Sequence, residues 1–207
     1  MVDGARPMST TPMHPRLGRV AVSLWIAGTI FGVVLLWDYS ATQGMVARPD
    51  RSWPDSPGLL RPEDKPCVVM FAHPRCPCTR ASLEELDRLM RDCRAVATVV
   101  FWQPEFGAAE WRDSDLVRVV RQSPRLHVHL DNGGDVTKTF GVMTSGTCLV
   151  FDSAGSLRFN GGLTPGRGHR GTTAAHARIA AILKADRATA RSTSGESFPV
   201  FGCSIRR

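Results

Sequence analysis

Residues 71–80 read FAHPRCPCTR and place two cysteines, Cys76 and Cys78, on either side of Pro77. An apolar run ends within this stretch, at Ala72, and an amphipathic helical pattern begins at Pro77. Proline suits the first turn of a helix, where no backbone donor is needed, so Cys76 should lie at the helix N-terminus. The unpaired amides and the helix dipole there favour an anion. We therefore expect Cys76 to have a lowered pKa and to react as a thiolate.

The second thiol limits how a disulfide could form. Arg75 and Arg80 could add positive charge beside Cys76. Cys78 lies two residues further on, and residues at this spacing do not face each other within a regular helix. A Cys76–Cys78 disulfide therefore requires Cys76 to lie outside the regular helix, and a strained bond of this kind is easily reduced. The alternative interpretation is a pair of buried small residues.

His73 lies three residues before Cys76. It could tune the thiolate, or it could join Cys76 and Cys78 as a ligand of a soft metal ion such as copper(I). An ordinary structural histidine in a loop is the alternative.

Four further cysteines are present: Cys67, Cys93, Cys148 and Cys203. Cys67 and Cys93 fit core positions. Cys148 begins a strand that should run antiparallel to residues 67–72, so it is either a third functional thiol or a buried strand residue. Cys203 follows the apolar residues FPVF in a polar tail, which indicates that the tail docks onto the domain. Docking could make Cys203 a resolving thiol or an extra ligand, with a simple packing role as the alternative.

The elements that must position these residues follow from the apolar periodicity. Strands are expected at 67–72, 95–102, 126–131, 147–152 and 156–161, and helices at 77–92, 113–122, 135–141 and 172–187. The last two strands should form a hairpin. Alternating β and α elements predict an α/β domain with a mainly parallel sheet covered by helices.

This order of elements, with a cysteine pair after the first strand, resembles the thioredoxin fold. The helix and strand at 113–131 resemble the insertion in peroxiredoxin-like, membrane-anchored thioredoxins of bacterial envelopes, as does the run DNGGDVTKTFGVMTSGTCLVFDSAGSL. The stretch His-Pro-x-Cys-Pro-Cys-Thr-Arg-Ala-Ser is also similar to bacterial proteins labelled RedB. The resemblance implies an attacking and a resolving thiol. These roles transfer to Cys76 and Cys78, although the usual spacing is Cys-x-x-Cys.

The loop that should face the cysteines departs from this family. The family has a cis-proline before threonine, where this chain has Ser145, Gly146 and Thr147. A cis bond before glycine costs about 2.5–4 kcal/mol, so we expect a trans bond. The resemblance implies that this loop pairs with substrate backbone. Gly146 should leave extra room there, for a metal ion or a bulkier ligand.

The N-terminal segment of the chain predicts a membrane anchor, and the rest of the chain divides into a linker, a domain and a tail. Residues 1–19 read as a cytoplasmic tail, 20–37 as a transmembrane helix, 38–62 as a proline-rich linker, 63–187 as the thioredoxin-like domain and 188–207 as a tail. The apolar span lacks charge over its length, and arginines precede it, so the positive-inside rule places the domain outside the inner membrane. A cleaved signal peptide is the alternative.

The expected function is a membrane-anchored thiol–disulfide oxidoreductase of the bacterial envelope, acting on a protein thiol or disulfide partner. A copper-binding or copper-delivery protein using the same cysteines is a second possibility, and a thiol peroxidase is a third. The formal charge of +7 arises from scattered arginines, so we expect no nucleic-acid partner.

Overall fold

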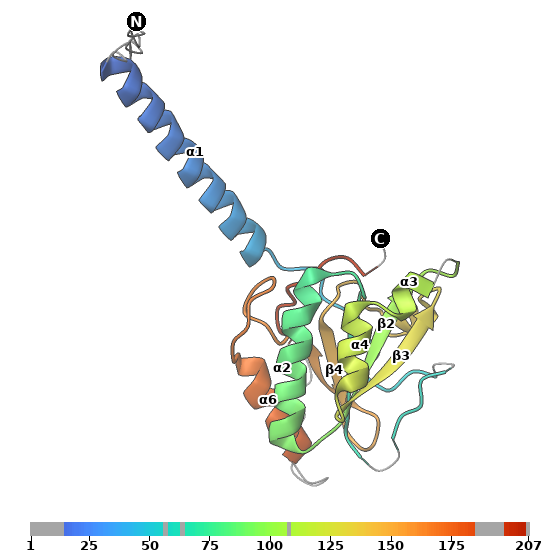
Figure 1. The fold of residues 1–207 in the computed structure, drawn as a ribbon. Coiled ribbons are helices and arrows are strands. Elements are labelled where there is room, and N and C mark those ends of the chain that lie inside the picture. Colours follow the sequence, from blue (N-terminus) through green and yellow to red (C-terminus); the bar gives the residue numbers. More distant parts are fainter. Residues whose placement is uncertain (1–14, 56–57, 63–64, 107–108, 185–196, 206–207) are drawn as a thin grey trace, which may run out of the picture. The chain divides into compact units, whose positions relative to one another are not determined.

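A computed structural model describes residues 15–55, 58–62, 65–106, 109–184 and 197–205. The chain divides into two units, Met1–Tyr39 and Ser40–Arg207. Helix α1, Pro15–Ala41, contains the predicted span 20–37 and continues beyond it at both ends (Figure 1). It is long and apolar enough to cross a membrane, and its apolar stretch is not buried within the structure. This exposure separates α1 from the core helix of a soluble domain, which would be covered on its apolar face.

The second unit is built on one five-stranded sheet in the order β3-β2-β1-β4-β5. The strands are β1, Cys67–Ala72; β2, Ala97–Gln103; β3, Leu126–Asn132; β4, Thr147–Phe151; and β5, Leu157–Gly161. Strands β1, β2 and β3 are parallel, whereas β4 runs antiparallel to β1 and forms a hairpin with β5. The predicted α/β class, the parallel strands and the closing hairpin are therefore confirmed.

Three helices cover one face of this sheet, where they lie side by side (Figure 1). They are α2, Pro77–Cys93; α4, Asp115–Gln122; and α6, Ala174–Lys184. Helix α4 starts where the sequence predicted, because the Ser114 hydroxyl caps it by accepting from the Val117 N–H. A further short helix, α3, Ala109–Arg112, was not predicted; four residues give no measurable periodicity.

The opposite face is covered by α5, Asp135–Thr139, and by the segment that follows α1. We expected residues 38–62 to be a proline-rich linker leading away from the membrane, whereas the compact second unit begins at Ser40 and includes this segment. Ala47 and Leu59 are buried in the core on this face. The Trp53 N–H donates to Gly155 O at 2.7 Å, which ties the segment to the β4–β5 turn. The prolines make this segment extended, and its spaced apolar residues dock it onto the sheet.

Candidate active site

The cysteine pair lies where β1 passes into α2. The Cys76 N–H donates to His73 O at 3.1 Å and closes a tight turn, and Cys76 itself is the N-cap residue of α2. Its backbone is extended (φ −88°, ψ 117°), and Pro77 occupies the first helical turn. The predicted position is thereby confirmed: Cys76 lies outside the regular helix, and Cys78 lies in its first turn.

The loop 144–147 before β4 faces this turn and is hydrogen-bonded to it. The Ser145 hydroxyl accepts from the His73 N–H at 2.9 Å and lies 2.7 Å from the Thr79 hydroxyl of α2. The Gly146 N–H donates to Phe71 O in β1 at 2.8 Å. These bonds connect the loop to both elements that hold the cysteines, so the loop and the cysteine turn form one rigid unit.

The peptide bond before Gly146 is as we expected, but the space beside this residue is smaller than we expected. The peptide bonds in the described part of the chain are trans, as predicted for the bond before Gly146. Its φ of +91° requires glycine. A Cβ there would lie 3.1 Å from the Ser82 hydroxyl, so the predicted room beside Gly146 is bounded by α2 side-chain atoms. The Thr147 hydroxyl is turned inward, donating to Thr144 O at 2.7 Å.

The C-terminal segment docks against the same loop, as its apolar residues predicted. The Ser145 N–H donates to Cys203 O at 2.9 Å, and the Ile205 N–H donates to Met143 O at 2.9 Å. Thr144 and Ser204 form an antiparallel bridge between these two bonds. The tail therefore runs as a short strand along loop 143–145 and places Cys203 beside the cysteine pair.

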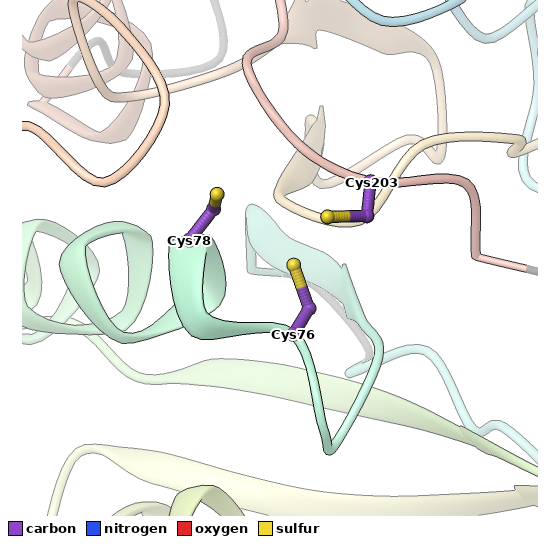
Figure 2. A group of neighbouring side chains, drawn as sticks. All are labelled: Cys76, Cys78 and Cys203. Atoms are coloured by element: carbon purple, nitrogen blue, oxygen red, sulfur yellow. The ribbon is translucent and has the colours of Figure 1, made fainter. Parts of the chain in front are cut away.

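Three sulfur atoms meet at this point. The Sγ atoms of Cys76, Cys78 and Cys203 all lie within 4.8 Å of one another. Figure 2 shows the sulfurs of Cys76 and Cys203 pointing towards each other, with Cys78 on the first turn of α2 beside them. Cys76 is 2% exposed and Cys78 is 8% exposed. The cysteines are thiols in this structure.

The surroundings of the three thiols favour a negative charge on Cys76. Burial raises the pKa of Cys76, but hydrogen bonds from the Cys203 thiol and the Thr79 hydroxyl, with smaller contributions from the backbone amides of Cys203 and Cys78, outweigh burial and lower the pKa below its ordinary value. Burial and the neighbouring Cys76 sulfur raise the pKa of Cys78. Burial and Cys76 raise the pKa of Cys203 to about 12. Of the three thiols, Cys76 is therefore the one whose surroundings favour the thiolate, and those of Cys78 and Cys203 favour the neutral form.

The groups that lower the pKa of Cys76 are not the two arginines that the sequence suggested. Arg75 and Arg80 are both exposed, and the Arg75 guanidinium lies over the Trp111 ring, 5.3 Å from its centroid. The side-chain donors to Cys76 are instead Cys203 and Thr79. The role of Thr79 was not predicted. Thr79 follows Cys78 directly, so it could have been found by asking which hydroxyl lies one turn into the helix from an N-cap thiol.

His73 packs among aromatic rings and does not belong to the group of three sulfurs. Its ring stacks on Trp102 with centroids 5.8 Å apart and meets the edge of Trp111 at 5.2 Å. Its Nδ1 accepts from the Arg75 N–H at 3.2 Å. The sequence offered both His73 and Cys203 as a third ligand beside Cys76 and Cys78, and among the described residues it is Cys203 that joins them.

The other three cysteines contribute to the two apolar cores. Cys148 is fully buried on β4 opposite Met70, and burial raises its pKa to about 12. Cys67 is buried on the other face, where its pKa is raised to about 11 by burial. Cys93 is partly buried beside the helix-covered core, and burial raises its pKa as well. Each of these thiols therefore favours its neutral form.

An open surface pocket of about 670 Å³ adjoins the cysteine turn. Its walls come from the start of α2 and from the inserted α3–α4 region. Cys76 and Pro77 line it, together with charges of both signs, including Arg80, Asp113 and Arg118. The inserted region therefore forms one wall of the approach to Cys76.

Arg167 connects the glycine-rich loop 161–171 to the tail. Its guanidinium donates to Gly202 O and to Thr42 O. Its positive charge also lowers the pKa of Cys78 and of Cys203, against the larger effect of burial on each. The sequence places Arg167 in a basic, glycine-rich loop that could rim the active site, and the docked tail supplies the Gly202 carbonyl to which it donates.

No protein-family model and no curated protein sequence matches this chain. Among solved structures, it is similar to an uncharacterised conserved protein from Geobacillus kaustophilus, with 20% sequence identity and a TM-score of 0.55, over 80% of this chain and 92% of that one. It is equally similar to a hypothetical protein from Sinorhizobium meliloti, with 20% identity and a TM-score of 0.54, over 80% of this chain and 94% of that one.

A lipoprotein thioredoxin from Streptococcus pneumoniae aligns with 59% of the chain and 85% of its own, with 21% identity and a TM-score of 0.42.

The topology itself assigns the fold. Without β3, the sheet order is β2-β1-β4-β5, with β1 and β2 parallel and β4 and β5 antiparallel to their neighbours. Helix α2, which carries the cysteine pair at its N-terminus, follows β1. Helix α4 and β3 are inserted between β2 and α5. The chain has a thioredoxin-like fold with an inserted helix and strand, preceded by one apolar helix.

Proposed function

We propose that this protein is a thiol–disulfide oxidoreductase in which Cys76 is the attacking thiolate. The observation that carries the proposal is the N-terminal position of Cys76 on α2, where hydrogen bonds from Cys203 and Thr79 lower its pKa and a second thiol of the pair lies within 4.8 Å. A lowered pKa raises the fraction of thiolate, and the thiolate is the nucleophile in disulfide exchange.

The reaction proceeds in two exchanges. The Cys76 thiolate attacks a substrate disulfide, forms a mixed disulfide with one substrate sulfur and expels the other as a thiolate. A second thiol of the cluster, Cys78 in the simplest scheme, loses its proton and attacks Cys76, which releases the remaining substrate thiolate. Two electrons pass to the substrate, and two cluster thiols become a disulfide. The same steps in reverse oxidise a substrate dithiol.

The natural partner in this proposal is a protein thiol or disulfide of the cell envelope, reached from a domain anchored by α1. Arg16 and Arg19 lie at the N-terminal end of α1, and the next basic residue after the apolar span is Arg48. This distribution favours a cytoplasmic N-terminus and an extracytoplasmic domain. Protease treatment of intact spheroplasts tests the orientation, since a domain outside the membrane is digested while a cytoplasmic control protein survives.

A redox titration tests the activity. The full-length protein in detergent is equilibrated in glutathione buffers of graded potential, and its free thiols are then alkylated and counted by mass spectrometry. We expect a two-electron transition that is absent in Cys76→Ser and unchanged in the control Cys93→Ser. Cys93 is a suitable control because it lies at the far end of α2, beside the core. A protein whose thiols stay reduced at every potential contradicts the proposal.

A soft-metal site is the second candidate function, and the convergence of the three sulfurs favours it. Three thiolates around one ion at about 2.3 Å, the distance known for zinc, stand about 4 Å apart, and the three sulfurs here lie within 4.8 Å of one another. Thiolates are preferred ligands of copper(I). This candidate is a copper-binding or copper-delivery role with Cys76, Cys78 and Cys203 as ligands.

Anaerobic competition with a copper(I) chelator distinguishes the two candidates. A metal protein binds one equivalent, loses binding in Cys76→Ser and keeps it in His73→Ala, because His73 packs between tryptophans outside the sulfur group. An oxidoreductase that uses these thiols for exchange alone binds copper no better than the Cys76→Ser variant.

A further inference from the structure

The C-terminal strand, residues 197–205, pairs with β5 and with loop 143–145 beside the cysteine pair, and we call the surface that it covers the seat. It begins with a parallel bridge between Ser197 and Asn160 at the free edge of β5, and the Phe198 N–H donates to Asn160 O at 3.0 Å. Further along, the Gly162 N–H donates to Pro199 O at 3.2 Å. The strand then leaves β5 and pairs with loop 143–145. Its backbone is therefore paired at both ends.

Glycines on both sides of this seat permit the close approach. A Cβ at Gly202 would lie 1.9 Å from Ser145 O, and a Cβ at Gly161 would lie 2.4 Å from the Phe198 Cβ. Neither distance is sterically possible, so any larger residue would push the strand out. The tail therefore packs closely against Ser145 at Gly202, next to Cys203, and against Gly161 at Phe198, near the start of the strand.

Apolar anchors fix the position of Cys203 along the seat. Val200 and Ile205, on either side of it, are both fully buried. The Phe198 ring stacks on Phe159 with centroids 5.0 Å apart. An extended segment with a central cysteine and flanking apolar residues is thus held across the reactive thiolate, which is the placement that a substrate cysteine needs for exchange with Cys76.

We propose that residues 200–205 occupy this protein's own binding site for an extended, cysteine-containing peptide, and that Cys203 closes a disulfide with Cys76 when the protein is oxidised. This inference rests on the proposed function, and it names both the substrate class and the thiol that resolves the exchange. A substrate peptide pairs with loop 143–145 after the tail has left, and the returning tail delivers Cys203.

The chemistry balances with the substrate disulfide as oxidant. Cys76 forms a mixed disulfide with one substrate sulfur, and the other substrate sulfur leaves as a thiolate that takes up a proton from water. The Cys203 thiol gives its proton to water and attacks the Cys76 sulfur. The Cys76–Cys203 bond forms, the mixed disulfide breaks, and the second substrate sulfur leaves and is protonated. The substrate gains two electrons, and the two cysteines lose them.

Peptide mapping tests the inference directly. Trypsin releases Cys76 and Cys78 together in the peptide CPCTR, residues 76–80, and Cys203 in the peptide STSGESFPVFGCSIR, residues 192–206. The full-length protein is oxidised with glutathione disulfide, acid-quenched, alkylated and digested. We expect the two peptides to be joined by a disulfide as the main product. Cys203→Ser removes this product, and Cys93→Ser keeps it.

A second variant tests the backbone seat without touching a thiol. Gly202→Ala should expel the strand, so the cross-linked product should fall at least tenfold. A synthetic peptide FPVFGCSI, supplied as its mixed disulfide with glutathione, should transfer to Cys76 and release glutathione more rapidly than it does in the wild type. Gly28→Ala is the matched control, because a Cβ there has nothing within 4 Å.

The outcomes separate this inference from the proposed function. An internal disulfide within CPCTR, with Cys203 still alkylated at full oxidation, overturns the inference and leaves the oxidoreductase intact. Unchanged cross-linking in Gly202→Ala overturns the seat. A Cys76 that forms neither disulfide removes the oxidoreductase itself, and the inference with it.

Discussion

Cys203 should act as a hydrogen-bond donor to Cys76, and two substitutions separate that role from its role as a thiol. Cys203→Ala removes the donor, whereas Cys203→Ser replaces it with a hydroxyl, which is a stronger donor. Both variants lose the third sulfur. If the hydrogen bond from Cys203 lowers the pKa of Cys76, the alanine variant should have a higher Cys76 pKa than the wild type, and the serine variant should not.

The size of the shift follows from the energy of the bond. A hydrogen bond to a charged acceptor contributes about 1.5–3 kcal/mol, and one pKa unit corresponds to about 1.4 kcal/mol. A thiol is a weak donor, so the lower end of the range applies, and we expect the pKa of Cys76 to rise by about one unit in Cys203→Ala. At a pH below the pKa of Cys76 this lowers the thiolate fraction up to tenfold, and alkylation slows in proportion.

The assay is the rate of iodoacetamide alkylation of the full-length protein between pH 5 and 9, followed on the peptide CPCTR, with fragmentation to separate label on Cys76 from label on Cys78. Other thiols interfere little in this range, because burial raises the pKa of Cys67 to about 11 and that of Cys148 to about 12. Cys93→Ser should give the wild-type curve. If the alanine and serine variants both titrate like the wild type, the hydrogen bond from Cys203 does not hold the thiolate, and the reasoning fails.

Three further predictions concern the frame around the site. Cys148→Ala should reduce the fall in the free energy of unfolding that occurs at alkaline pH. Burial raises the pKa of Cys148 from 9.0 to about 12, so the stability that this thiol contributes is complete below pH 9 and falls by about 1.4 kcal/mol per pH unit above it. Urea unfolding of the variant and the wild type at pH 8 and 10 measures this difference. Glu85→Ala should cost about 3 kcal/mol, because the buried carboxylate accepts from the Gly171 N–H and pairs with His176; a loss under 1 kcal/mol in urea would contradict this. Gly146→Ala should cost about 1–3 kcal/mol because φ is +91°, and an unchanged thermal midpoint would refute that.

The sequence predicted the fold and the position of the cysteine pair, because those features are local. Apolar runs and helical periodicity located the strands and the main helices, and Pro77 located the start of α2 with Cys76 at its N-cap. The parallel order and the closing hairpin followed from the alternation of elements. Each of these depends on residues within a few positions of one another, which a pattern along the chain can register.

The remaining features depend on contacts across long stretches of sequence. The tail was expected to dock, but its pairing with loop 143–145 could not be read from FPVFGC alone. Segment 38–62 looked like a linker because its prolines are visible, while Ala47 and Leu59 reveal their role only once the sheet is present. His73 was given a ligand role on spacing, whereas the tryptophans that stack on it come from β2 and α3.

The two ends of the folded domain are joined to each other by hydrogen bonds. The Gly44 N–H, just after α1, donates to Val200 O at 2.8 Å, and the Thr144 hydroxyl of the loop donates to Met45 O at 2.8 Å. The segment that follows α1 is thus hydrogen-bonded both to the strand that carries Cys203 and to the loop beside it. The chain's entry into the domain and its reactive cysteines share one set of bonds, so a displacement at Gly44 or Met45 would act directly on the strand that carries Cys203.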